Sequence, residues 1–114
     1  EGHFRHNALF VGANTKQAVS EGRGDYTPCF FYEVPRLFET EIPVDVALIM
    51  VTPPDQHGKV SLGVSVDYTR AAAKNAKIVI AQVNDQMPYT YGDSQMDVSE
   101  IDYFVEHSAP LPEL

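Results

Sequence analysis

The sequence of 114 residues contains no tryptophan and only one cysteine, Cys29. A single cysteine excludes a disulfide within the chain and is typical of a protein from a reducing compartment. No apolar stretch approaches the roughly 20 residues of a membrane-spanning helix, and no charged segment followed by an apolar core opens the chain. These features predict a cytoplasmic protein with no membrane among its partners.

Basic residues are scarce: eight Lys and Arg stand against sixteen Asp and Glu, which gives a formal net charge of -8. Nucleic-acid grooves and anionic membrane surfaces attract clusters of Lys and Arg. We therefore expect no nucleic acid among the partners. The sequence contains no internal repeat, low-complexity tract or linker, and it is long enough to form one domain with a core.

The most informative segment is an apolar run, 44–51, that passes directly into a polar loop, 52–58. The run is almost continuously apolar and rich in β-branched residues, which predicts a strand covered on both faces, as in a parallel sheet. Pro53 and Pro54 end the strand because neither can donate a ladder hydrogen bond.

A second apolar run, 77–83, follows the first and predicts another strand covered on both faces. The segment between the two runs predicts a short extended piece at 59–63 and a helix that is capped by Ser65 or Asp67 and ends at Asn75. A helix between two such strands indicates a right-handed crossover connection. The two strands are therefore expected to be parallel neighbours.

The remainder of the chain also alternates strands and helices. The predicted elements are a strand at 7–11, a helix capped by Asn14 or Thr15 and closed by Gly22, a brief strand at 26–28, a helix at 32–39 and a strand, rather than a short helical turn, at 101–106. The predicted fold class is α/β, in three layers, with a mainly parallel sheet and crossover helices.

Two polar loops stiffened by proline, 52–58 and 84–94, leave the predicted parallel strands at the same edge of the sheet. Ligands of open α/β sheets bind beyond the carboxyl ends of the strands, so the loops are predicted to form one wall of a binding site. The residues expected to shape this wall and bind the substrate are Pro54, Asp55, His57, Gly58, Gln86, Met87 and Pro88.

Several of these residues also have an ordinary structural role. Asp55 can cap the turn backbone and His57 can cap its own turn, and for both residues we favour that role over one in a pocket. Gln86, Met87 and Pro88 offer an amide, a polarizable thioether and a rigid backbone. These groups suit contact with an acyl chain or a pantetheine arm and supply no reactive group.

The sequence shows no catalytic set. Ser94 follows Gly92-Asp93 and lacks the context of a nucleophile elbow, and no phosphate loop or pair of catalytic acids is present. His3 and His6 are spaced as a metal-binding pair would be, but no Cys or third His lies near them. We therefore predict neither a metal site nor a catalytic residue in this chain.

Several ordered motifs together resemble a known family. They are 24–30 (GDYTPCF), 33–35 (EVP), 51–58 (VTPPDQHG), 61–69 (SLGVSVDYT), 81–88 (AQVNDQMP), 92–94 (GDS) and 99–106 (SEIDYFVE). On these motifs the chain resembles the acetyl-CoA hydrolase/transferase family of class I CoA-transferases, and within it the 4-hydroxybutyrate CoA-transferases. The resemblance spans nearly the whole sequence.

The resemblance implies an enzyme of two similar α/β domains that exchanges CoA between an acyl-CoA and a small carboxylate of the 4-hydroxybutyrate or acetate kind. In the family, a glutamate of the C-terminal domain attacks the thioester and forms an acyl-glutamyl anhydride and then a glutamyl-CoA thioester. By this resemblance, 1–109 is the later part of the N-terminal domain, and 110–114 begins the linker to a missing C-terminal domain. The implied partners are acyl-CoA, the carboxylate, that domain and further copies of the protein, and coenzyme A is a substrate rather than a bound cofactor.

Two other functions stay open. One is acyl-CoA hydrolysis, in which water instead of a carboxylate resolves the intermediate. The other is a catalytically silent α/β scaffold for domain association, and the fragment by itself is expected to be inactive in either case. Tyr89 replaces the arginine that usually follows Met-Pro in the family, and Lys59-Val60 replaces the usual pair after His-Gly, so the preferred acid also stays open.

Overall fold

The computed structural model describes residues 2–113. Contacts within the chain divide it into two compact units, Glu1–Val34 and Pro35–Leu114, although the sequence shows no linker at this boundary. Each unit has a parallel sheet of its own. None of the helices within residues 2–113 has both the length and the apolar character that a membrane crossing requires.

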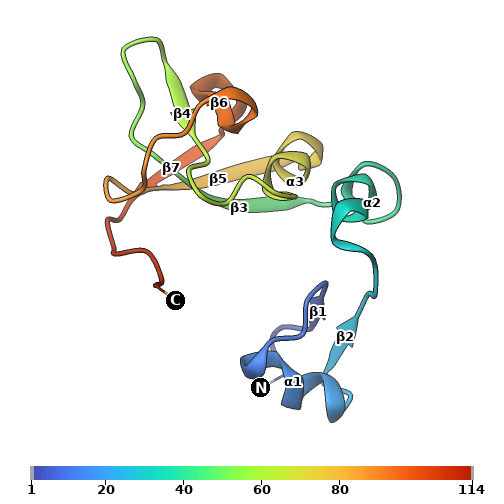
Figure 1. The fold of residues 1–114 in the computed structure, drawn as a ribbon. Helices are drawn as coiled ribbons and strands as arrows, with labels where there is room; N and C mark the ends of the chain where they lie inside the picture. Colours follow the sequence, from blue (N-terminus) through green and yellow to red (C-terminus); the bar gives the residue numbers. More distant parts are fainter. Residues whose placement is uncertain (1, 114) are drawn as a thin grey trace. The chain divides into compact units, whose positions relative to one another are not determined.

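The first unit is built on a parallel strand-helix-strand motif. β1 (His6–Ala8) pairs in parallel with β2 (Gly24–Tyr26), and α1 (Ala13–Ser20) connects them (Figure 1). The predicted strands are therefore present but short, and β2 lies two residues earlier than predicted, since the strand was expected at 26–28.

The end of α1 confirms the predicted role of Gly22. Its φ of +72° lies in the left-handed region, which glycine enters without steric cost. The N–H groups of Gly22 and Arg23 donate to the carbonyls of Val19 (3.1 Å) and Ala18 (2.9 Å), and this pattern closes the last helical turn.

The beginning of α1 differs from the prediction. Neither Asn14 nor Thr15 caps the helix, because it begins at Ala13 with Gly12 at the cap position and no side chain bonded to the cap. The Thr15 hydroxyl donates back to the Gly12 carbonyl at 3.3 Å, as a residue inside the first turn does.

The predicted helix at 32–39 is observed as a 3-10 turn, η1 (Phe31–Glu33), followed by α2 (Val34–Thr40). Pro35 lies in the first turn of α2, where its missing N–H removes no helical hydrogen bond. Phe38 stacks on Tyr68, with 5.8 Å between ring centroids, and this contact attaches α2 to the segment before the next helix.

The second unit contains a parallel sheet of three strands in the order β3-β5-β7. β3 (Val46–Val51) pairs with β5 (Ile78–Val83), and β5 pairs with β7 (Tyr103–Glu106). The structure confirms that the two apolar runs form parallel neighbours and that 101–106 contains a strand. The last residues of all three strands lie side by side, so the three strand exits share one edge.

The core lies on one face of this sheet, where α3 (Thr69–Asn75) covers the strands (Figure 1). Its small Ala73 is 4% exposed, which lets the helix backbone approach the sheet closely. The core residues are Ala47, Ile49, Val51, Val60, Leu62, Ala73, Val79, Ala81, Met96 and Ile101.

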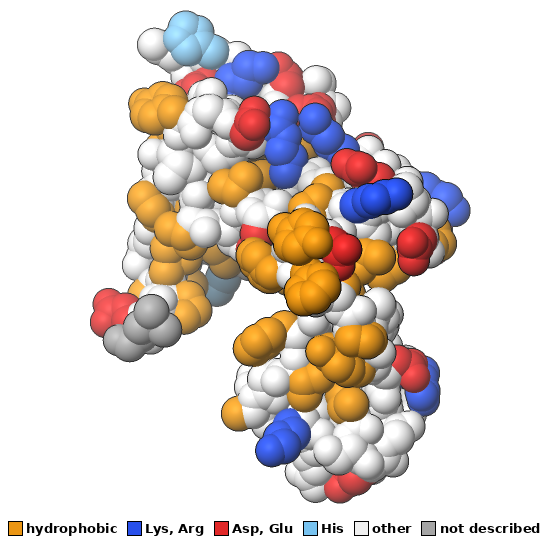
Figure 2. Space-filling model, turned by 45° about the vertical axis from the view of Figure 1, so that its right-hand side comes forward, with side chains coloured by type: hydrophobic (Ala, Val, Ile, Leu, Met, Phe, Trp, Pro, Cys, Tyr) orange, Lys and Arg blue, Asp and Glu red, His pale blue; other side chains and the backbone are white. Residues whose placement is uncertain are grey.

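The prediction that both apolar strands are covered on two faces is wrong for the described residues. Burial alternates along β3: Ala47, Ile49 and Val51 are buried, whereas Leu48 is 77% exposed. β7 is exposed along its whole length. The described residues of the second unit thus build two of the three predicted layers. Hydrophobic side chains are visible at the molecular surface (Figure 2). The strand sequence is apolar on both faces, but within the second unit the described residues cover only one.

The extended piece predicted at 59–63 is β4 (Lys59–Ser61), which pairs antiparallel with an unpredicted strand, β6 (Gln95–Asp97). β6 is bounded by two 3-10 turns, η2 (Gly92–Ser94) and η3 (Val98–Glu100). Val60 of β4 lies opposite Met96 of β6, and both side chains join the core. The α3 helix begins at Thr69 with Tyr68 at the cap position, so neither Ser65 nor Asp67 is its cap residue as predicted. Asp67 accepts from the Thr69 N–H at 3.1 Å just before the helix.

Candidate functional site

The two predicted loops meet at the carboxyl edge of the parallel sheet. Thr52, the first residue after β3, is buried and donates its N–H to the Ser61 carbonyl at 2.9 Å. Asn84, the first residue after β5, donates its N–H to the Val51 carbonyl at 2.9 Å. The Tyr89 hydroxyl reaches Asp55 at 2.9 Å, so loop 84–94 touches loop 52–58 directly. The expected convergence of the two loops is confirmed.

Asp55 organises the first loop. Its Oδ1 accepts hydrogen bonds from the N–H groups of His57 (2.8 Å) and Lys59 (2.9 Å), while its own N–H donates to the Lys59 carbonyl at 2.8 Å. The turn also requires a φ of +71° at Gly58, which suits glycine. The favoured capping role of Asp55 is therefore confirmed. The Lys59 N–H, followed by the Tyr89 hydroxyl and the His57 N–H, lowers the pKa of the Asp55 carboxyl against the opposing effect of desolvation.

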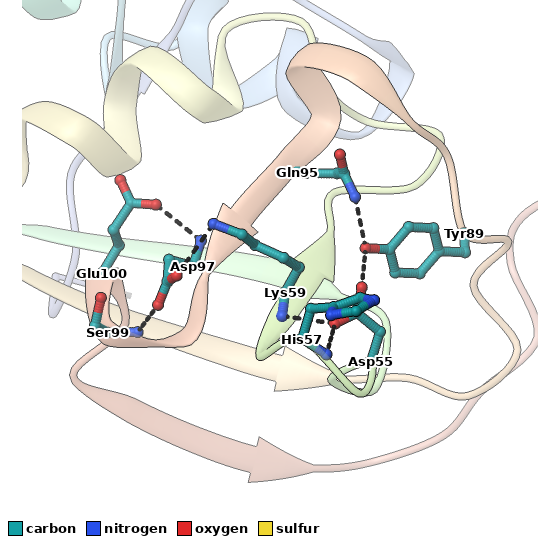
Figure 3. A network of polar contacts seen from close by, with 8 residues as sticks. All are labelled: Asp55, His57, Lys59, Tyr89, Gln95, Asp97, Ser99 and Glu100. Carbon is teal, nitrogen blue, oxygen red and sulfur yellow. Dashed lines mark hydrogen bonds and ion pairs between the residues drawn. The ribbon is translucent and has the colours of Figure 1, made fainter.

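Tyr89 links this loop to β6. Its hydroxyl donates to Asp55 Oδ2 at 2.9 Å and accepts from Gln95 Nε2 at 2.9 Å (Figure 3). The ring also lies 5.1 Å from that of Tyr91, measured between centroids. The Gln95 donor favours the phenolate, but desolvation and the bond to the Asp55 carboxylate outweigh it and raise the pKa of Tyr89.

A neighbouring network fixes the other side of β4. Asp97 accepts from the Ser99 N–H at 3.0 Å and from Lys59 Nζ at 3.1 Å, while its own N–H donates to Glu100 Oε2 at 2.9 Å (Figure 3). This reciprocal pattern is a capping box for η3. The Ser99 N–H, and after it the Lys59 ammonium, lower the pKa of the Asp97 carboxyl to about 2.

The other predicted wall residues have different surroundings. The His57 ring is exposed and lies 3.4 Å from the Gln56 amide nitrogen. Gln86 and Pro88 are exposed, but Met87 is only 6% exposed and faces the interior. A Cβ at Gly63 would collide with the Met87 side chain, so the thioether packs directly on the backbone of that glycine. Met87 supports its loop from beneath.

Asn84 is a buried polar residue at this edge that sequence reasoning did not single out. Its side chain is fully buried, donates Nδ2 to the Ala109 carbonyl at 2.8 Å and accepts from the Ala109 N–H at 3.2 Å. The same Oδ1 accepts from the Gln86 N–H at 3.0 Å. Asn84 thereby ties the segment after β7 to the loop after β5. A polar side chain directly after a buried strand was the signal that could have revealed it.

Ser61 plays a similar part at the end of β4. Its fully buried hydroxyl accepts from the N–H groups of Gly63 and Thr90, each at 3.0 Å, and donates to the Thr90 carbonyl at 2.9 Å. The Thr90 hydroxyl in turn donates to the Gly63 carbonyl at 2.9 Å. These bonds hold loop 84–94 against the end of β4.

A cavity of about 600 Å³ opens at this edge, between the first loop and the ends of β5 and β7. We call it the rim groove. Its volume lies within the range of small-molecule sites. Of the predicted wall residues, Pro54 and Gly58 line it, whereas Asp55, His57, Gln86, Met87 and Pro88 do not. Asp55 and Met87 instead hold the surrounding loops. The lining residues are Pro53, Pro54, Gly58, Val83, Asp85, Val98, Phe104, Glu106 and Ser108.

The chemistry available at this edge is that of binding. The rim groove offers apolar surface from Val83, Val98 and Phe104, together with the carboxylates of Asp85 and Glu106. Within residues 2–113, no three His, Cys, Asp or Glu side chains gather closely enough to hold a metal ion.

The family model of the acetyl-CoA hydrolase/transferase N-terminal domain matches residues 1–112. The chain belongs to this family. It is 66% identical over 113 residues to the 4-hydroxybutyrate coenzyme A transferase of Clostridium kluyveri, covering 98% of this chain and 26% of that protein. It is 51% identical over 115 residues to the succinyl-CoA:acetate/propanoyl-CoA:succinate CoA transferase of Fasciola hepatica, covering 100% of this chain and 24% of that protein.

Solved structures show the same fold. RipA from Yersinia pestis matches with a TM-score of 0.86 and 34% identity over 96% of this chain and 27% of that chain. The 4-hydroxybutyrate CoA-transferase from Porphyromonas gingivalis matches with a TM-score of 0.75 and 36% identity over 96% of this chain and 30% of that chain. The predicted family and α/β fold class are thus confirmed. The chain spans about a quarter of the length of these curated relatives.

Proposed function

We propose that this chain is part of a CoA-transferase that moves CoA between an acyl-CoA and a small carboxylate such as 4-hydroxybutyrate or acetate. One observation carries the proposal: the exits of neighbouring parallel strands meet at a groove, in a chain 66% identical to a 4-hydroxybutyrate coenzyme A transferase. Ligands of open α/β sheets bind at such an edge.

In this proposal the rim groove is one wall of the acyl-CoA site. Pro54 and Gly58 contact the substrate from the first loop, while Asp55 and His57 fix that loop. Gln86, Met87 and Pro88 shape the second loop, and the exposed Gln86 amide is free to donate to the acyl-CoA. Coenzyme A enters as a substrate and leaves as part of a product.

The covalent steps belong to a glutamate outside this chain. Its carboxylate attacks the thioester carbonyl, which forms an acyl-glutamyl anhydride and releases the CoA thiolate. The thiolate then attacks the glutamyl carbonyl, which releases the first acid and forms a glutamyl-CoA thioester. The second carboxylate reverses these two steps and leaves as the new acyl-CoA. In this proposal the glutamate lies in a C-terminal domain that residues 110–114 connect to this chain. The whole protein is a cytoplasmic homo-oligomer. Residues 1–114 alone are inactive, because they lack the glutamate.

Trapping the glutamyl-CoA thioester tests this proposal. The full-length protein is incubated with butyryl-CoA and treated with borohydride or hydroxylamine, and its peptides are mapped by mass spectrometry. We expect one modified glutamate beyond residue 114 and CoA transfer to acetate. The proposal would be refuted if the protein formed no acyl-CoA-dependent adduct and transferred no CoA. A catalytically silent scaffold would show neither the adduct nor the transfer.

Acyl-CoA hydrolysis is the second candidate, because the family that matches residues 1–112 includes hydrolases as well as transferases. The two activities differ in the group that resolves the intermediate. Product analysis with and without acetate separates them. A transferase forms acetyl-CoA and releases little free CoA when acetate is present, whereas a hydrolase releases free CoA at the same rate in both cases.

A further inference from the structure

The rim groove combines apolar walls with two carboxylates. Phe104 of β7, Val83 of β5 and Val98 of η3 supply aliphatic and aromatic surface. Glu106 lies two residues beyond Phe104, on the same face of β7, because alternate residues of a strand share a face. Asp85 and Glu106 both line the groove and both are exposed.

Among the described residues, no Lys, Arg or His lines the groove, and neither Asp85 nor Glu106 forms an ion pair. Glu106 is held in register opposite Val83, and the Asp85 N–H donates to Ser108 Oγ at 3.2 Å. The buried Asn84 side chain bonds to the backbone of Ala109 and so fixes the segment that follows β7. The backbone that carries each of the two carboxylates is therefore held in place by hydrogen bonds.

We propose that the rim groove holds the aliphatic tail of the acyl group and that Asp85 and Glu106 exclude acyl groups that carry a second carboxylate. This proposal rests on the function proposed above and adds the class of acid: uncharged acyl tails rather than those of dicarboxylic acids. The negative charge of the groove selects this occupant, because it repels an anionic tail and accepts an uncharged one.

The two parts of the groove act on different properties of the substrate. Each methylene that leaves water for an apolar wall strengthens binding about fourfold. A second carboxylate about 4 Å from Asp85 or Glu106 weakens binding about fivefold at the dielectric of water, and about tenfold for each acidic neighbour where the groove excludes part of that water. Salt screens this second effect and leaves the first one in place.

The charge effect is tested by comparing two CoA donors in the full-length protein. kcat/KM is measured for butyryl-CoA and for succinyl-CoA, with acetate as the acceptor, in the wild type, Glu106→Gln and Asp85→Asn. The control is Glu39→Gln, which removes an exposed carboxylate on α2 that does not line the groove. We expect the wild type to prefer butyryl-CoA and each groove variant to raise the ratio of succinyl-CoA to butyryl-CoA about tenfold. The control leaves the ratio unchanged, and 1 M salt reduces the effect.

The apolar wall is tested with acetyl-, propionyl- and butyryl-CoA. In the wild type, kcat/KM rises with each added methylene, by up to about fourfold. Phe104→Ala flattens this rise. Tyr103→Ala, which truncates the adjacent aromatic on the opposite face of β7, leaves it in place. Melting temperatures of both variants verify that they are folded.

Three results would overturn the proposal. The first is a wild type that uses succinyl-CoA as well as butyryl-CoA. The second is an equal fall of kcat/KM for both donors in Glu106→Gln and Asp85→Asn, which would place the pantetheine arm common to both donors in the groove. The third is a wild type that transfers CoA from no donor, in which case the proposed function itself fails. The first two results, in which CoA is still transferred from butyryl-CoA, refute the groove assignment alone.

Discussion

Single buried polar side chains hold the candidate site together. Asn84 and Ser61 are both fully buried. Asn84 bonds to Ala109 and Ser61 bonds to Thr90, so each residue joins two segments that lie far apart in the sequence. Asn84 also closes the turn after β5 by accepting from the Gln86 N–H. A buried polar group is costly when it loses its partner, because it cannot return to water. The positions of the two loops therefore depend strongly on these two residues.

We predict that Asn84→Ala lowers the free energy of unfolding by about 2 to 3 kcal/mol, because the substitution leaves the N–H and carbonyl of Ala109 without their partners. Urea unfolding of the purified protein measures the change. Asn75→Ala is the matched control, since Asn75 is exposed and bonds only within α3. A cost for Asn84→Ala no larger than that of the control would contradict the proposed clamp.

Asp97 gives the structure a specific dependence on acid. Its pKa of about 2 lies below the value near 4 of an unfolded chain. The carboxylate therefore stabilises the fold fully above about pH 4, and this contribution is lost as the pH falls toward 2. We expect Asp97→Asn to be less stable than the wild type at neutral pH and the difference to shrink between pH 4 and 2. Thermal unfolding across this range checks it, and a difference that stays constant with pH would refute the assignment.

Among the helices and strands, the sequence was sufficient to predict the strands of the parallel sheet and the edge at which they end. It was not sufficient to predict β6 or the groove residues on β7. The apolar runs at 44–51 and 77–83 carry a local signal that is independent of the rest of the chain. β6 was missed because its three residues show no periodicity and become a strand only by pairing with β4. Phe104 and Glu106 were missed as site residues for a related reason, since the register of β7 against β5 brings them to the groove.

The contact between Gly63 and Met87 joins β4 to loop 84–94, and it can be tested against a second glycine. Gly63 and Gly92 have similar backbone angles, with φ of +63° and +79°. A Cβ at Gly63 collides with Met87, whereas a Cβ at Gly92 meets nothing within 4 Å. We expect Gly92→Ala to cost about 1 kcal/mol from backbone strain and Gly63→Ala about 3 kcal/mol or more. Equal costs in urea unfolding would show that Met87 does not pack as described.

At the scale of the whole molecule, the second unit has one covered and one open sheet face. Leu48 is 77% exposed and Val46 45% exposed on the face opposite the core. The prediction that both faces are covered was made because the run is apolar on both faces. An apolar run does not show which residues pack against it. The same reasoning located the loops correctly, because the edge at which parallel strands end is set by strand direction alone.

In the proposed enzyme, an acyl group lies against the loops at the carboxyl edge of the β3-β5-β7 sheet. The most direct measurement is photocrosslinking of the full-length protein with an acyl-CoA whose acyl tail carries a diazirine, followed by mass spectrometry of the labelled peptides. We expect labels within 52–58 and 83–108, above all at Phe104 and Val98, and we expect these labels to be lost when butyryl-CoA competes. Labels confined to residues outside these segments, or unaffected by the competitor, would contradict it.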